Sequence, residues 1–412
     1  MNKLLLGTAL AAVASSAVYA GGIERTTQSA LVLYKDGNYV ELSHGQVTPT
    51  VSGEGLGIAA GGVAAGTDYD KVAQSYNQTG ISAKIDLTDR LSFGLVLDSP
   101  FGADIEYDGA SLTTELGGTS ASAETKAQTF LLKYQFDDHF SGFGGIRRQT
   151  ASGDITLDGI AYGGPTVVNR SGISLLDSRA RSGASGYSVE LGESTATGFV
   201  VGGAYERKDI ALRVAVTYNS AIEHEMDTTE VLPVTAIVGL SGLTPITATI
   251  NNTTTGTTKV KTPQSWNLEF QSGVAKDTLV FGSIRWVEHS AFKIAPDFFK
   301  DNVKKSGLVD LDDTTTYRLG VGRRFTPNFS AQASIAHERS SSDDLKSPLA
   351  PTNGYTGISI GGAYKFDGGL ELAGGVTYLK LGDAKAATAD TARADFSGNT
   401  AMGAGIRISY AF

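Results

Sequence analysis

Apolar and polar residues alternate along much of the chain. Between 209 and 219 every second residue is apolar, namely Ile210, Leu212, Val214, Val216 and Tyr218. The same period of two recurs in 90–98, 129–136 and 315–325, and again at the end of the chain. Successive side chains of a strand point to opposite faces, so this pattern predicts β-strands with one apolar and one polar face.

Fourteen such segments are separated by connections of two kinds. Short polar turns such as Thr88-Asp89 alternate strictly with long stretches rich in Gly, Thr, Ser and Asp. The predicted strands are 38–48, 71–87, 90–100, 124–136, 139–157, 187–206, 209–226, 259–275, 278–292, 313–325, 328–340, 354–366, 369–381 and 400–412. The long connections are 49–70, 101–123, 159–186, 227–258, 293–312, 341–353 and 382–399.

Short turns at one end and long loops at the other are typical of outer-membrane barrels with an even number of strands. Most predicted strands reach the roughly 9–11 residues that a tilted strand needs to cross the hydrocarbon. A soluble sandwich has no reason to place every long connection at one end. We therefore predict an all-β protein, a fourteen-stranded antiparallel transmembrane β-barrel. Aromatic residues near strand ends fit its interfacial girdles: Tyr134, Phe136, Phe140, Tyr205, Phe325, Phe329, Tyr364, Phe366, Tyr410 and Phe412.

Residues 1–20 have the pattern of a secretory signal peptide. Lys3 is followed by a small apolar run and by Val18-Tyr19-Ala20, a small-residue cleavage site. The alternative is a buried N-terminal helix. No later run of apolar residues is long enough for a membrane-spanning helix.

Composition excludes several classes of function. The chain has 412 residues with 51 Gly, no Cys and a net charge of −9. Without Cys there is no disulfide scaffold, thiolate metal site or thiol catalysis. The acidic balance gives no support to a nucleic-acid partner.

Several motifs, in order along this plan, resemble the outer-membrane long-chain fatty-acid transporter family, the FadL-like proteins, which include aromatic-hydrocarbon importers. Ser99-Pro100-Phe101-Gly102 resembles the Ser-Pro-Phe-Gly element of the family. The remaining matches are 198–206 with 216–220, 262–265, and 347–351 with 358–364. The alternating Tyr410 and Phe412 also resemble the last strand that the barrel assembly machinery recognises.

The resemblance implies a monomeric barrel, 38–412, with an N-terminal hatch at 21–37 and a third strand kinked at Ser99, Pro100, Phe101 and Gly102. It also implies a lateral opening, passive transport of a fatty acid or aromatic hydrocarbon, and contact with outer-membrane lipids. No cofactor is implied.

Alternation places a set of arginines on the polar, inward face of the predicted strands: Arg213, Arg285, Arg318, Arg324 and Arg407. A charge facing lipid at mid-membrane would cost about 2–4 kcal/mol, which favours this placement. Guanidinium groups suit carboxylates, so some of these arginines are candidates for binding the ligand head group. The alternative is an Arg–Glu network that only fills the barrel.

Candidate apolar contacts come from the hatch and the kink. Leu31, Leu33 and Tyr34 could face a hydrophobic ligand or only pack the hatch against the wall, and Phe101 could line an uptake path. The Ala/Gly-rich stretch 53–66 is either part of that path or a flexible outer loop.

Catalysis and metal binding are not predicted. The histidines, at 44, 139, 224, 289 and 337, have no metal-ligand spacing, and no Gly-x-Ser-x-Gly elbow is present. Acidic groups at 310–313 and 343–344 could bind calcium or be solvated loop charges.

We therefore expect a protein of the bacterial outer membrane that passively transports hydrophobic compounds, with long-chain fatty acids as the first candidate ligand. The alternatives are a general diffusion porin for small polar solutes and a structural or adhesive barrel that uses loop 227–258.

Overall fold

The computed structural model describes residues 23–180, 182–303, 305 and 307–412. The predicted signal peptide and the first two residues of the predicted hatch lie outside these ranges.

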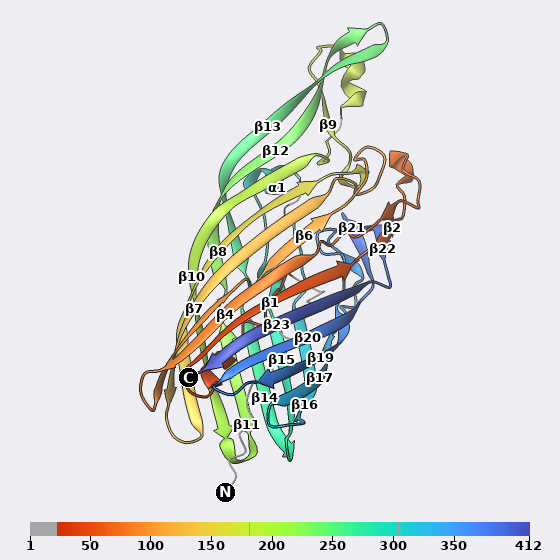
Figure 1. The fold of residues 1–412 in the computed structure, drawn as a ribbon. Coiled ribbons are helices and arrows are strands. Elements are labelled where there is room, and N and C mark those ends of the chain that lie inside the picture. Colours follow the sequence, from red (N-terminus) through yellow and green to blue (C-terminus); the bar gives the residue numbers. More distant parts are fainter. Residues whose placement is uncertain (1–22, 181, 304, 306) are drawn as a thin grey trace.

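Antiparallel strands form one closed barrel of fourteen strands, as predicted (Figure 1). The single-element strands are β1 (Tyr39–Thr50), β4 (Tyr76–Asp86), β7 (Ser120–Gln135), β8 (Phe140–Leu157), β10 (Tyr187–Arg207), β15 (Thr278–Val287), β16 (Thr314–Arg324), β17 (Phe329–Glu338), β19 (Tyr355–Lys365), β20 (Leu370–Leu381) and β23 (Thr400–Ala411). Three further strands are interrupted: β5 (Leu91–Asp98) with β6 (Gly102–Glu106), β11 (Leu212–Asn219) with β12 (Ile222–Ser241), and β13 (Thr244–Thr262) with β14 (Ser265–Ala275). β1 closes the barrel against β23, from Tyr39–Ala411 to Thr50–Thr400.

Smaller elements lie in the connections and at the N-terminal side. The short strands are β2 (Gly53–Gly55), β3 (Asp68–Tyr69), β9 (Thr166–Asn169), β18 (Leu345–Lys346), β21 (Ala384–Thr388) and β22 (Thr391–Phe396). The helical turns are η2 (Leu31–Tyr34), η3 (Ala59–Gly61), η4 (Ile160–Tyr162), η5 (Ser174–Arg179), η6 (Lys208–Ile210), η7 (His289–Ala291) and α1 (Asp297–Asn302). Among the described residues, no helix is long and apolar enough to span a membrane.

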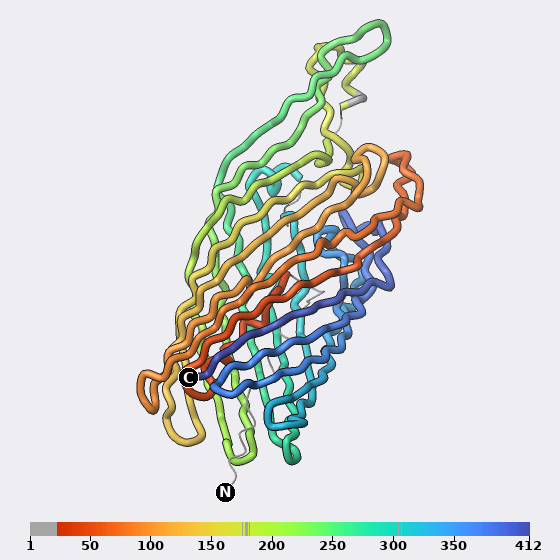
Figure 2. Tube along the Cα trace, in the orientation of Figure 1, coloured from red at the N-terminus to blue at the C-terminus, as the bar shows by residue number. Residues whose placement is uncertain are grey.

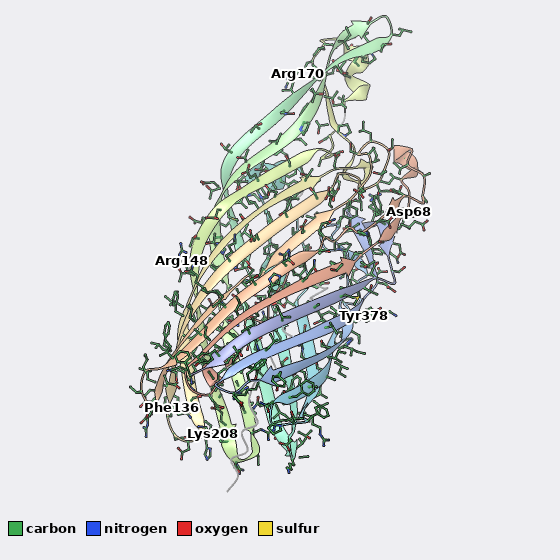
Figure 3. All side chains as sticks on the ribbon, in the orientation of Figure 1. Asp68, Phe136, Arg148, Arg170, Lys208 and Tyr378 are labelled. Carbon is green, nitrogen blue, oxygen red and sulfur yellow. The ribbon has the colours of Figure 1, made fainter. Side chains whose placement is uncertain are left out.

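The two faces of the strands differ as the alternation predicts. On β23, Ile406, Ile408 and Tyr410 are exposed on the outer face, whereas Arg407 and Ser409 are buried inside. Aromatic rings gather at the short-turn end, where Phe140 and Tyr205 lie 5.0 Å apart and Tyr364 and Phe366 lie 4.8 Å apart, measured between ring centroids. Figure 3 labels Phe136 and Lys208 at this end, and Asp68 and Arg170 at the opposite end.

The expectation of a long irregular loop at 227–258 is wrong. β12 and β13 form a paired hairpin from Ile222–Thr262 to Ser241–Thr244, which projects beyond the rest of the barrel (Figure 2). Nearly all of β13 up to Thr257 is exposed on both faces. Residues 251–257 contain no apolar side chain, so no apolar–polar alternation marks this part as a strand. Its many Thr residues have high β-propensity, which favours a strand even where apolar and polar residues do not alternate.

The long loops fold together at the outer end of the barrel. β18, β21, β22, β2 and β3 form a second, five-stranded sheet. Lys346 pairs with Asp312 at 2.6 Å, and Lys385 pairs with Asp344 at 2.7 Å. The lysine hydrogen bonds lower the pKa of both carboxyl groups. These acidic residues therefore connect loops to one another.

Candidate functional site

The third strand of the barrel is interrupted at the predicted kink. β5 ends at Asp98, opposite Ala127 of β7, and β6 resumes at Gly102, opposite Glu124. Three residues, 99–101, thus stand against only two on β7, which makes this a bulge. The buried Thr125 hydroxyl fixes the bulge, because it accepts a hydrogen bond from the Phe101 N–H at 2.9 Å and donates one to the Phe101 carbonyl at 2.7 Å.

The interruption opens a gap in the barrel wall beside β4. Regular pairing of β4 with β5 ends at Ile81–Leu97. Beyond it the next contact in the same register is an isolated bridge, Ala73–Ile105. Within the described structure, residues 76–80 of β4 therefore lack a strand partner on this side. We call this interval the wall gap.

The N-terminal segment takes up the backbone groups that the third strand leaves unpaired at the kink. Glu24 forms an antiparallel bridge with Phe101. The Arg25 N–H donates to the Pro100 carbonyl and the Gly102 N–H donates to the Ile23 carbonyl, both at 2.8 Å. The Arg25 guanidinium also lies 4.2 Å from the centroid of the Tyr76 ring, so it covers the edge of β4. The segment thus occupies the kink from inside the barrel.

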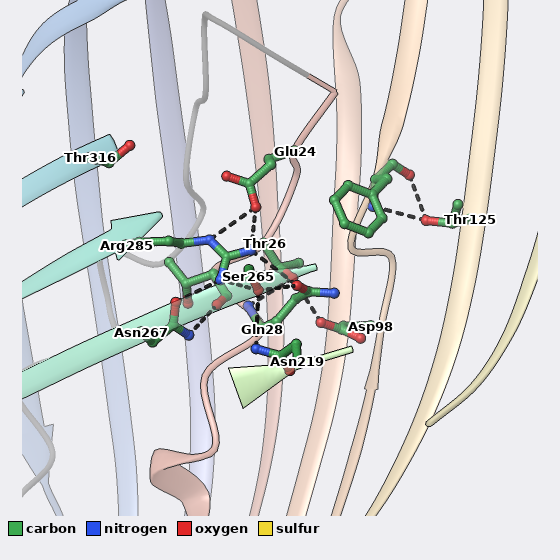
Figure 4. A network of polar contacts seen from close by, with 12 residues as sticks. Glu24, Thr26, Gln28, Asp98, Thr125, Asn219, Ser265, Asn267, Arg285 and Thr316 are labelled. Atoms are coloured by element: carbon green, nitrogen blue, oxygen red, sulfur yellow. Dashed lines mark hydrogen bonds and ion pairs between the residues drawn. The ribbon is translucent and has the colours of Figure 1, made fainter. Parts of the chain in front are cut away.

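A buried ion pair attaches the same segment to the wall formed by β14 and β15 (Figure 4). Arg285 donates to the Glu24 carboxylate, to Gln28 at 3.0 Å and to Asn267 at 2.6 Å. The side chains of Glu24 and Arg285 are only 1% and 4% exposed. An unpaired buried charge is strongly unfavourable, so removing either side chain would destabilise the charge of the other.

The remainder of the segment follows the inner wall toward the short-turn end. The Ser29 hydroxyl donates to Glu269 at 2.8 Å, and the Lys84 ammonium donates to the Lys35 and Gly37 carbonyls at 2.8 and 3.1 Å. η2 lies between these anchors with Leu33 fully buried. The segment is therefore anchored to the barrel at several points between Glu24 and Gly37.

An inner cavity of about 220 Å³ lies between this segment and the wall. Its lining includes Arg213, Arg318, Arg407 and Leu31 from the predicted set, together with Asp98. Arg213 bonds Gln271 at 2.9 Å, and Arg407 bonds Glu371 at 2.9 Å. The cavity is thus lined by both charged and apolar groups.

The other predicted residues lie elsewhere. Arg285 belongs to the ion pair with Glu24, and Arg324 bonds Asp277 in the turn before β15, away from the cavity. Leu33 and Tyr34 pack η2 against the wall, where the Tyr34 and Phe143 rings meet edge to face at 6.3 Å. Phe101 is buried at the kink.

A smaller outer cavity of about 100 Å³ borders the far end of the wall gap. It is lined by Tyr76 and Ile105 from the two sides of the gap, by Arg25, and by apolar residues that include Val47 and Leu349.

Sequence reasoning missed four polar side chains that hold the N-terminal segment and the kink in place: Glu24, Gln28, Asp98 and Thr125. Their only signal was their position in or beside the segments expected to form the hatch and the kink.

Among the described residues, no group of three His, Asp or Glu side chains could hold a metal ion. The acidic residues at 312 and 344 pair with lysines instead.

A closed barrel with an interrupted strand, an internal N-terminal segment and an apolar outer face defines an outer-membrane channel. A profile of the family described as outer membrane protein transport protein (OMPP1/FadL/TodX) matches residues 6–412. The chain therefore belongs to this family of outer-membrane transporters for hydrophobic compounds. Members of the family are transport channels, not enzymes.

Solved structures show the same fold at low sequence identity. A Pseudomonas aeruginosa FadL homologue is 14% identical, with a TM-score of 0.67 over 93% of this chain and 92% of that one. The Pseudomonas putida toluene transporter TodX is 15% identical, with a TM-score of 0.61 over 95% and 96%. The Ralstonia pickettii toluene transporter TbuX is 11% identical, with a TM-score of 0.57 over 97% of both chains. No curated protein sequence matches this chain.

Proposed function

We propose that the protein carries long-chain fatty acids passively across the outer membrane and that the ligand leaves the barrel through the wall gap. The observation that carries this proposal is the gap itself, between residues 76–80 of β4 and the interrupted third strand. A barrel wall normally hydrogen-bonds every strand to both neighbours, since lipid cannot satisfy free backbone groups. An interruption at the level of the hydrocarbon therefore supports a role in passage.

The chemistry of the two cavities supports a ligand with a long apolar part and a carboxyl group. The outer cavity offers aliphatic side chains beside the gap. The inner cavity offers Arg213, Arg318 and Arg407, and guanidinium groups are suited to carboxylates. Toluene, the ligand named for two of the similar structures, has no carboxylate to pair with these guanidinium groups. Aromatic hydrocarbons are thus the second candidate ligand class.

Residues 21–37 act in this proposal as a movable hatch. Residues 23–25 cover the kink and the Arg25–Tyr76 contact covers the gap, so the segment has to detach from the kink before ligand can pass. No energy source is required, because the ligand moves down its own gradient.

A reversible cross-link tests the hatch. Glu24 and Phe101 are directly bridged, and paired residues of adjacent antiparallel strands lie at a separation that a disulfide can span. The chain has no Cys, so E24C/F101C forms a single defined cross-link. The matched control is S359C/T377C, a facing pair within the uninterrupted wall between β19 and β20.

We expect oxidised E24C/F101C to take up labelled hexadecanoate at least tenfold more slowly than the same variant after reduction. The control should give equal rates in both states. Comparing one variant in two redox states removes the effect of the substitutions themselves. Equal rates for oxidised and reduced E24C/F101C would contradict the proposed movement.

A further inference from the structure

The lipid-facing surface beside the wall gap carries a polar patch in the middle of an apolar belt. On β1 the outer face begins with Val40 and Leu42 and continues with His44 and Gln46. Across the strand pair, His44 faces Thr79 and Gln46 faces Asn77 of β4. All four side chains are exposed. We call these four residues the exit patch.

The depth of the patch follows from its other neighbour, β23. The exposed face of β23 runs from Tyr410 at the short-turn end through Ile408 and Ile406 to Met402. His44 lies directly opposite Ile406, in the middle of this row. Polar and ionisable side chains are unfavourable at this depth and are usually retained for function.

The patch also borders the gap. Thr79 and Asn77 belong to the interval of β4 where pairing with the third strand has ended. The lining of the inner cavity includes both His44 and Thr79, together with Asp98 on the opposite side of the gap. The His44 ring nitrogen Nδ1 lies 2.9 Å from the Thr79 hydroxyl, so the two side chains form one hydrogen-bonding unit.

We propose that the exit patch binds the polar head group of the ligand as it passes from the inner cavity into the membrane. The patch combines imidazole, hydroxyl and carboxamide groups and contains neither Lys nor Arg. It therefore suits a neutral hydrogen-bonding head group, such as an undissociated carboxyl, on a long hydrocarbon chain. A plain hydrocarbon has no group that can hydrogen-bond to the patch, so the patch points to amphiphiles as the substrate class. This inference rests on the proposed lateral path.

The chain offers a matched control in an uninterrupted part of the barrel wall. His337 Nδ1 lies 3.0 Å from the Thr356 hydroxyl, also on the exposed face. This pair sits near the outer end of β17, where pairing with both β16 and β19 is continuous. It has the same chemistry as His44–Thr79 but borders no gap.

The test compares H44L/T79V with H337L/T356V in cells that have no other transporter of this family. Initial uptake of labelled hexadecanoate and of labelled toluene is measured for each. Loss of one hydrogen bond to the head group weakens binding of the head group about fivefold. We expect H44L/T79V to take up hexadecanoate at least about fivefold more slowly, with toluene uptake unchanged. H337L/T356V should match the wild type for both, and H44N/T79S, which keeps two hydrogen-bonding groups, should retain hexadecanoate uptake.

Stability separates this role from a structural one. Apolar residues on the lipid face should leave the thermal unfolding midpoint of H44L/T79V unchanged or higher, although transport falls. Unchanged hexadecanoate uptake, or an equal loss for both ligands, would overturn the inference. Failure of the proposed function has a different signature, since oxidised E24C/F101C would then carry hexadecanoate as fast as the reduced form.

Discussion

The replacement Glu24→Gln tests how the N-terminal segment is held. It removes the negative charge that pairs with Arg285 in Figure 4 and keeps the size of the side chain. We expect the segment to detach from the kink far more often, with the barrel intact.

The magnitude follows from burial. Both side chains are almost fully enclosed, and removing one partner of a buried pair costs about 3–5 kcal/mol. Gln28, Ser265 and Asn267 still accept hydrogen bonds from Arg285, which favours the lower end of that range. About 3 kcal/mol corresponds to a shift of roughly 100-fold in the attachment equilibrium.

Amide hydrogen exchange measures the equilibrium between the attached and the detached segment directly. The Arg25 and Gly102 amides bond across the contact between the segment and the kink, so both exchange when the segment detaches. We expect their protection to fall about 100-fold in the Glu24→Gln variant. Glu371→Gln is the control, because it removes a partner of Arg407 between wall strands and leaves these amides protected. Protection within about threefold of the wild type in Glu24→Gln would refute the reasoning.

Three further changes probe other contacts. Leu33→Ala leaves a cavity under η2, and we expect it to weaken attachment of the segment by about 2–5 kcal/mol, seen as faster exchange of η2 amides. Gly102→Val places a Cβ 2.5 Å from the Arg25 Nε, so it should move the Arg25 side chain off the Tyr76 ring and weaken attachment of the segment, seen as faster exchange of the Arg25 amide. The pKa of Asp312 is lowered by Lys346, so this ion pair stabilises the outer loops above the unfolded-state pKa and is lost as pH falls through the folded-state pKa. Loop exchange, corrected for its intrinsic pH dependence, should therefore rise only below about pH 4 and stay flat between pH 5 and 8; a rise near pH 6 would contradict this origin.

Much of the wall could be predicted from sequence, because a period of two directly encodes which side chains face lipid. Arg213 and Arg407 were placed inside by that rule alone, and both are buried there. Arg324 obeys the same rule, but it ends β16 and reaches the carboxylate of Asp277 in a neighbouring turn. Alternation gives the face of a residue but not its height along the barrel.

The contacts of the N-terminal segment could not be predicted in this way. Residues 23–38 have no strand or helix periodicity, and Glu24 meets a partner 261 residues away. Such a contact exists only after β14, β15 and the kinked third strand have closed into one barrel. The position of the kink came from the resemblance of 99–102 to a family motif, since Pro100 alone does not determine which neighbour loses its pairing.

The central claim is that the protein admits hydrophobic compounds but not ions or small polar solutes. Hexadecanoate uptake by cells that produce the wild-type protein, together with single-channel conductance of the purified protein in planar bilayers, tests this claim most directly. The account predicts uptake well above that of cells without the protein, with negligible steady conductance. A large steady conductance without enhanced hexadecanoate uptake would contradict it and would indicate a general diffusion porin.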